Sequence, residues 1–118
     1  MQEKNYVTVD TVSKLRDMVE HIKSSELIAF DTETNSLNTR KGKIIGFSVS
    51  GEIGKGFYMP TMVFGDGELK DNYIEGKLCH DLAKRTISLL IGKKIIGHNF
   101  SFDSRFVKHL YGVDLLPS

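Results

Sequence analysis

A run of four apolar residues that ends in acids constrains the fold more than any other feature of this chain. Residues 27–30 read Leu-Ile-Ala-Phe and are followed directly by Asp31, Thr32, Glu33 and Thr34. A continuous apolar run of this kind is typical of a central strand that is buried on both faces. Asp31 and Glu33 are two residues apart, so on a strand their side chains leave the same face. The sequence therefore predicts a buried strand that carries two carboxylates at its carboxyl end.

Strand and helix patterns alternate along the rest of the chain. The β-rich or apolar runs that predict strands cover residues 6–9, 27–30, 44–50, 57–60 and 94–98. The apolar residues at helical spacing that predict helices cover residues 12–22, 74–90 and 102–111. A short glycine-containing connection predicts that the third and fourth strands form an antiparallel hairpin. Residues 61–72 are expected to form a surface loop with a turn at 65–67. This order predicts an α/β fold with a mixed sheet and helices on its faces.

A third acid follows the last predicted strand. His98 and Asn99 end that strand, and Asp103 lies in the first turn of the helix that follows. Mg²⁺ binds carboxylate oxygens, and two such ions about 4 Å apart can activate a water and stabilise the leaving oxygen of a phosphodiester. Taken singly, each motif also has an explanation without metal. Acids at a strand end are often solvated, and an acid in a first helical turn is favoured by the helix dipole.

Together the two acidic motifs resemble the first two motifs of the DEDD superfamily of 3′-5′ exonucleases. The first reads Phe-Asp-Thr-Glu-Thr-Asn-Ser-Leu over residues 30–37, and the second reads Gly-His-Asn-Phe-Ser-Phe-Asp over residues 97–103. The likeness is strongest to the proofreading domain of bacterial and phage family A DNA polymerases, and it covers residues 27 to 114. It implies a ribonuclease H-like mixed sheet, in which strands one to three of the family are antiparallel and the fourth is parallel to the first.

The resemblance also implies roles for individual residues. Three acids are implied to serve catalysis and to hold two divalent metal ions, Mg²⁺ or Mn²⁺: Asp31, Glu33 and Asp103. Three further residues are implied to contact the single-stranded 3′ end of a DNA substrate: Thr34, Leu37 and Asn99. For Leu37, a wedge against the terminal base and a plain loop anchor both remain open. His98 is expected to be a structural residue at a strand end and not a metal ligand.

The family pattern includes a fourth acid, in a Tyr-x-x-x-Asp motif that these 118 residues lack. Tyr111 and Asp114 are the nearest pair and have the wrong spacing. We therefore expect residues 1–118 to form one partial exonuclease domain that stops before the last strand and the C-terminal helices. Such a domain would leave an open sheet edge and turn over slowly alone. A polymerase domain or a second polypeptide could complete it.

Composition limits the partners without fixing the activity. A net charge of +1 gives no strong non-specific grip on nucleic-acid phosphates. The single cysteine, Cys79, excludes an intramolecular disulfide and fits a cytoplasmic setting, which with the resemblance means a bacterial or phage-infected cell. No apolar run is long enough to cross a membrane. The basic residues Arg40, Lys41 and Lys43 fit either a nucleic-acid contact or a solvated loop.

Two alternatives to a proofreading exonuclease stay open. The chain could be a non-catalytic scaffold or nucleic-acid-binding module of a polymerase. It could also be an exoribonuclease of the ribonuclease D type, which shares the metal chemistry, and the sequence offers no identifiable reader of the RNA 2′-hydroxyl. Retention of Asp31, Glu33 and Asp103 favours a catalytic origin over a decayed scaffold.

Overall fold

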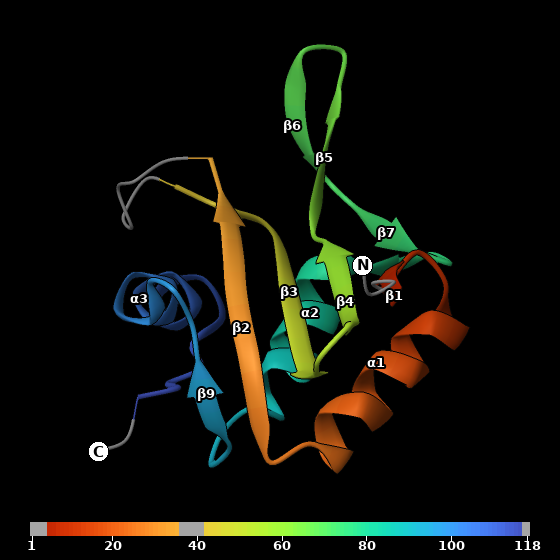
Figure 1. Ribbon diagram of the computed structural model, residues 1–118. Coiled ribbons are helices and arrows are strands. Elements are labelled where there is room, and N and C mark those ends of the chain that lie inside the picture. Colours follow the sequence, from red (N-terminus) through yellow and green to blue (C-terminus); the bar gives the residue numbers. More distant parts are fainter. Residues whose placement is uncertain (1–4, 36–41, 117–118) are drawn as a thin grey trace.

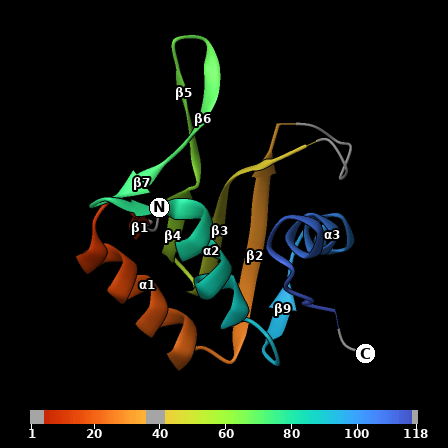
Figure 2. The ribbon, with the colours of Figure 1, turned by 180° about the vertical axis from the view of Figure 1, so that it is seen from behind.

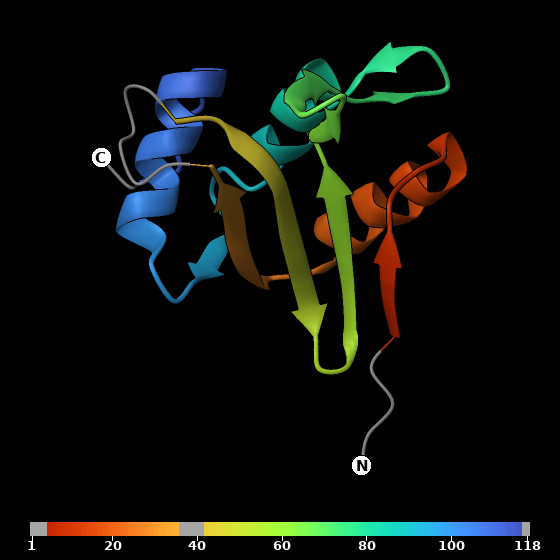
Figure 3. The same ribbon diagram turned by 90° about the horizontal axis from the view of Figure 1, so that it is seen from above.

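A five-stranded mixed sheet forms the centre of the molecule. The computed structural model describes residues 5–35 and 42–116 (Figure 1). The strands of the sheet are β1 (Asn5–Thr8), β2 (Leu27–Thr34), β3 (Ile44–Glu52), β4 (Lys55–Pro60) and β9 (Lys94–Ile96). They lie in the order β1-β4-β3-β2-β9, with β1 at one edge and β9 at the other (Figure 3). The pairs β2–β3 and β3–β4 are antiparallel, and β9 is parallel to β2, which confirms the predicted sheet.

Three helices cover one face of this sheet: α1 (Val12–Ser24), α2 (Cys79–Ser88) and α3 (Phe100–Tyr111). Helices α1 and α2 lie behind the sheet in Figure 1 and in front of it in Figure 2, while α3 lies beside β2 and β9. Thr11 caps α1, because its hydroxyl accepts a hydrogen bond from the Lys14 N–H at 3.1 Å. Gly112 ends α3 in the left-handed conformation, with φ of 70°. Among the described residues, no helix combines the length and apolar character that crossing a bilayer requires.

The segment between β4 and α2 differs from the prediction. Residues 61–72, expected as a loop, contain the hairpin of β5 (Met62–Gly65) and β6 (Glu68–Asp71), which projects from the sheet (Figure 1). Its turn has positive φ at both Asp66 and Gly67, as in the type I′ turns that match the twist of paired strands. The Asp-Gly pair was therefore a signal for a hairpin and not only for a turn.

The second helix is shorter than its apolar spacing predicts. Residues 73–78 form a second hairpin, β7 (Tyr73–Ile74) and β8 (Lys77–Leu78), so Ile74 is buried from a strand and α2 begins only at Cys79. The helix ends at Ser88, and Gly92 lies beyond it in a turn. The hairpin is attached to the start of α1, where the Glu75 carboxylate accepts a hydrogen bond from the Val12 N–H at 2.6 Å. That bond links the hairpin to the first turn of α1.

The core lies between the sheet and the helices, and β2 shows how it is built. Alternate residues of β2 face the helices, and Ile28 and Phe30 are fully buried there. The Phe30 and Phe47 rings pack with their centroids 6.1 Å apart. The intervening residues of β2 face the opposite side, which the described helices leave open. Because the acids Asp31 and Glu33 belong to that second set, the fold places them on the open face.

Candidate active site

Two exposed carboxylates lie side by side on the open face of the central strand. Asp31 and Glu33 are both exposed, while Phe30 between the helices and the sheet is fully buried. Within the described ranges, neither carboxylate forms an ion pair with a lysine or an arginine. Strand alternation thus produces the acid pair predicted from the sequence, and no lysine or arginine of residues 5–35 and 42–116 forms an ion pair with either acid.

Glu33 is held by a tyrosine from two strands away. The Tyr58 hydroxyl on β4 donates a hydrogen bond to Glu33 Oε2 at 2.6 Å. To reach it, the Tyr58 ring crosses β3 at Gly46, where a Cβ would overlap the phenol oxygen. Burial, and then the adjacent Glu33 carboxylate, raise the pKa of Tyr58 well above its usual range. The phenol therefore keeps its proton and serves as a donor to Glu33.

Asp103 lies on the other side of β2. It is only 4% exposed, and its Oδ1 accepts a hydrogen bond from the Thr32 hydroxyl at 2.6 Å. Burial raises the pKa of Asp103, the hydroxyl and backbone of Thr32 oppose that rise, and the negative charge of Asp31 adds to it. Asp31 is thus near enough to act on Asp103 electrostatically, although Asp31 leaves the open face of β2 and Asp103 approaches the strand from α3 on the covered side.

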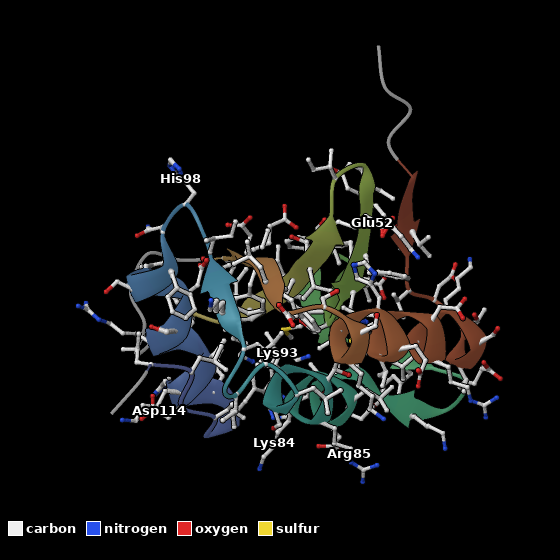
Figure 4. All side chains as sticks on the ribbon, turned by 60° about the horizontal axis from the view of Figure 1, so that its bottom comes forward. Glu52, Lys84, Arg85, Lys93, His98 and Asp114 are labelled. Atoms are coloured by element: carbon white, nitrogen blue, oxygen red, sulfur yellow. The ribbon has the colours of Figure 1, made fainter. Side chains whose placement is uncertain are left out.

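The turn between β9 and α3 packs tightly against β2. A Cβ on Gly97 would lie 2.8 Å from the Phe30 carbonyl oxygen, so only glycine permits this approach. Asn99 is exposed and precedes α3, and its carbonyl accepts the Asp103 N–H at 3.0 Å, while its side chain makes no capping bond. His98 is exposed and points away from the body of the molecule (Figure 4). The close approach at Gly97 brings the second acidic motif beside the first.

The remaining predicted site residues lie at the end of β2 or after it in the sequence. Thr34 is half-buried at a register shift between β2 and β3. Leu37 lies outside the described residues, as do Arg40 and Lys41. Lys43 is exposed, and its N–H donates to the Asn35 side-chain oxygen at 2.7 Å.

A groove of about 430 Å³ adjoins Asp31 on the open face. The side chains along it include Tyr6, Ser48, Ser50 and Tyr58. Sequence reasoning did not single out these residues. A signal did exist, because Ser48 pairs with both Asp31 and Tyr58 in the sheet, and paired residues share a face. Reading it requires the strand register, which the sequence does not state.

The donor set suits a hard divalent cation. Mg²⁺ is commonly bound by one or two carboxylates together with water and substrate phosphate oxygens, and Asp31 and Glu33 offer such a pair. Over the described residues, no three histidine, cysteine, aspartate or glutamate side chains gather around one point. The structure therefore brings Asp31 and Glu33 together and turns Asp103 toward Thr32.

Comparisons with known proteins identify the family and the fold of the chain. The chain is 34% identical over 104 residues to DNA polymerase I of Borreliella burgdorferi, an alignment that covers 88% of this chain and 11% of that protein. The fold matches Brucella melitensis NrnC with bound Mg²⁺ at a TM-score of 0.55 and 16% identity, covering 99% of this chain and 48% of that one. It also matches the Aedes aegypti Nibbler EXO domain at a TM-score of 0.59 and 12% identity, covering 100% and 50% of the two chains.

The family model is the most specific of these comparisons. A model described as 3′-5′ exonuclease matches residues 6–117, which include both acidic motifs and every strand of the central sheet except the first residue of β1. The solved structures are less than 25% identical and support the fold alone, namely that of ribonuclease H-like exonucleases. The chain belongs to the 3′-5′ exonuclease domain family of DNA polymerase I-like, family A polymerases.

Proposed function

We propose that this chain is the metal-binding part of a 3′-5′ exonuclease that removes nucleotides from single-stranded DNA 3′ ends, as in polymerase proofreading. One observation carries the proposal: a member of this family presents Asp31 and Glu33 together, exposed and without a described cationic partner, on the open face of its central strand. Stability does not explain this arrangement, because like charges on one strand face repel each other.

Each site residue has a proposed role that follows from its position. Asp31 and Glu33 would hold divalent metal, and Asp103 would serve a second ion. Bound Mg²⁺ or Mn²⁺ supplies activation of water and stabilisation of the leaving oxygen of the phosphodiester. Thr34, Leu37 and Asn99 would contact the 3′ end, and the groove beside Asp31 leaves room for a nucleotide. Thr32 and Tyr58 are neutral donors, so they hold the acids without neutralising them.

DNA is the substrate that the comparisons favour. The relative at 34% identity is a DNA polymerase, whereas NrnC, solved with Mg²⁺ and also bound to pGG, resembles this chain at 16% identity. A competition between labelled DNA and unlabelled RNA of the same sequence distinguishes the two substrates. We expect an equimolar amount of unlabelled RNA to lower the rate of DNA degradation by less than twofold.

Turnover by these 118 residues is expected to be slow. They carry three of the four acids of the family pattern, and losing one metal ligand generally lowers the rate by orders of magnitude. A polymerase domain or another polypeptide with a Tyr-x-x-x-Asp motif would complete the site. Metal binding is therefore a more direct test of the proposal than rate.

The test combines calorimetry with a nuclease assay. Mn²⁺ is titrated into the chain, into Asp31→Ala and into Asp17→Ala, which removes an exposed acid of α1. The same three proteins are incubated with a 5′-labelled single-stranded oligonucleotide and Mn²⁺. We expect binding, and a slow ladder of 3′-shortened products, in the chain and in Asp17→Ala but not in Asp31→Ala.

Two results would contradict the proposal. Equal Mn²⁺ binding by the chain and Asp31→Ala would place any bound metal elsewhere and favour a scaffold role. Robust digestion that survives Asp31→Ala would assign the activity to other residues or to a contaminant.

A further inference from the structure

We propose that Tyr58 is a positioning residue, whose hydroxyl fixes the Glu33 carboxylate in the orientation that metal binding requires. The inference rests on the proposed function, because it concerns the same site. It assigns a role to a residue of β4 that neither acidic motif contains. The phenol oxygen lies 2.6 Å from Glu33 Oε2, a distance typical of a strong hydrogen bond to a carboxylate.

The path of the Tyr58 side chain requires a gap in the sheet surface. Glu33 pairs with Gly46 in the register of β2 and β3, so Gly46 lies beside the acid. A Cβ at Gly46 would overlap the phenol oxygen and the ring carbon that carries it. Glycine at this position therefore lets a residue on β4 reach across β3 to an acid on β2. Three strands contribute to one contact.

Packing alone does not explain the hydroxyl. Tyr58 is half-buried on the open face, where a phenylalanine would cover the same apolar surface and a free phenol could bond to water. Glu33 is exposed, and an unrestrained glutamate there would sample many rotamers. A neutral donor removes that freedom and keeps the negative charge that a cation needs. Hydrogen-bond partners of ligating carboxylates typically change metal affinity by about 10- to 100-fold.

The other two acids have no side-chain donor on the open face among the described residues. Asp103 also has a neutral hydroxyl donor, Thr32, but that pair lies on the covered side. In the described residues Asp31 has no side-chain donor, and its shorter side chain has fewer rotamers to lose. The long, exposed acid is thus the one that gains most from a fixed partner on the open face.

The experiment uses two independent ways to remove the contact. Tyr58→Phe deletes the hydroxyl, and Gly46→Ala keeps it but displaces the ring. Two matched controls repeat the same chemistry elsewhere. Tyr73→Phe changes a tyrosine that is 58% exposed on β7, and Gly65→Ala adds a Cβ whose nearest neighbours would be atoms of the flexible Lys70 side chain, at 3.4 Å or more. Mn²⁺ affinity is measured by calorimetry and folding by thermal melting for all five proteins.

We expect Mn²⁺ affinity to fall roughly 10- to 100-fold in Tyr58→Phe and Gly46→Ala, and to stay within twofold in both controls. Unchanged affinity in a folded Tyr58→Phe would overturn the inference while leaving the proposed function intact. A lower melting temperature with unchanged affinity would make Tyr58 a purely structural residue and would also overturn it. Absence of Asp31-dependent Mn²⁺ binding in the unaltered chain would instead overturn the proposed function, and this inference with it.

Discussion

The two faces of β2 differ in what their residues do. On the covered face, Ile28 and Phe30 are fully buried and Thr32 bonds to Asp103 of α3. On the open face, Asp31 and Glu33 are exposed, and the only side-chain partner that the described residues give them is Tyr58. One strand thus carries the core of the fold and the candidate chemistry on alternating residues, which is the period that a strand imposes.

The same type of hydrogen bond has different consequences on the two faces of β2. Tyr58–Glu33 and Thr32–Asp103 are both hydroxyl–carboxylate hydrogen bonds of 2.6 Å. Water can replace the first, because Glu33 is exposed, whereas Asp103 is 4% exposed and depends on its protein partner. Substitutions on the covered face should therefore change stability, and those on the open face should change metal binding.

Phe30 and Asp31 provide the sharpest contrast. Phe30→Ala removes a fully buried ring and should lower the free energy of unfolding by about 3–5 kcal/mol. Asp31→Ala, one residue away, should change it by less than about 0.5 kcal/mol. Urea unfolding followed by circular dichroism measures both. A loss of more than about 2 kcal/mol in Asp31→Ala would mean that the open face also supports the fold.

Thr32→Val tests the hydrogen bond on the covered face. The substitution keeps the shape of the side chain and removes the donor, which leaves the buried Asp103 carboxylate short of a partner. We expect a loss of about 1–3 kcal/mol in urea unfolding. Thr32→Ser retains a hydroxyl and should recover most of that loss. Equal stability of Thr32→Val and the unaltered chain would show that Asp103 does not depend on this bond.

The alternation of β2 is the part of the molecule that the sequence predicts best. The apolar run before Asp31 indicates a buried strand, and the two-residue spacing to Glu33 places both acids on one face, as the structure confirms. The resemblance also predicted the directions of β3, β4 and β9 correctly. The alternation of β2 is a local feature, and the strand directions follow from the resemblance to the family.

Sequence reasoning missed one local feature and two that depend on distant parts of the chain. The spacing of Ile74 to Leu82 fits a helix, and only the type I′ turn at Glu75 and Gly76 shows that a hairpin intervenes. The contact of Tyr58 with Glu33 requires the register of three strands. Asp103 is 71 residues from Thr32, so its turn toward the covered face follows from the docking of α3.

His21 makes the stability of the covered face depend on pH. It is buried on α1, and its Nε2 accepts a hydrogen bond from the Gly51 N–H of β3 at 2.8 Å, which requires the neutral ring. Burial, and then the positive charge of Lys55, lower the pKa of His21 below 6.5, while Glu52 opposes the shift. As the pH falls below 6.5, His21 of the unfolded chain binds a proton before His21 of the folded chain does. The contribution of neutral His21 to the free energy of unfolding is therefore full above pH 6.5, and it is lost as the pH falls through the folded pKa.

His21→Gln isolates that contribution, because its amide can accept the same hydrogen bond and does not titrate. We expect the unaltered chain to lose about 1 kcal/mol more than His21→Gln when unfolding by urea is compared at pH 7.5 and below pH 6. Parallel pH dependence of the two proteins would assign the effect to other groups. The substitution lies on the covered face, so Mn²⁺ affinity at pH 7.5 should be the same in both.

Asp103→Asn gives the smallest expected effect and the one that links the two faces. Burial raises the pKa of Asp103, so the folded chain opposes its ionisation, and the stability linked to that proton is present at low pH and lost as the pH rises through the folded pKa. Asparagine can still accept from Thr32 without a buried charge. At pH 7.5 the variant should therefore be more stable by at least about 0.5 kcal/mol in urea unfolding, with weaker Mn²⁺ binding. A variant that is less stable would show that the fold needs the charge of Asp103. A gain in stability at the expense of metal binding would instead mark Asp103 as an acid retained on the covered face for the chemistry of the open one.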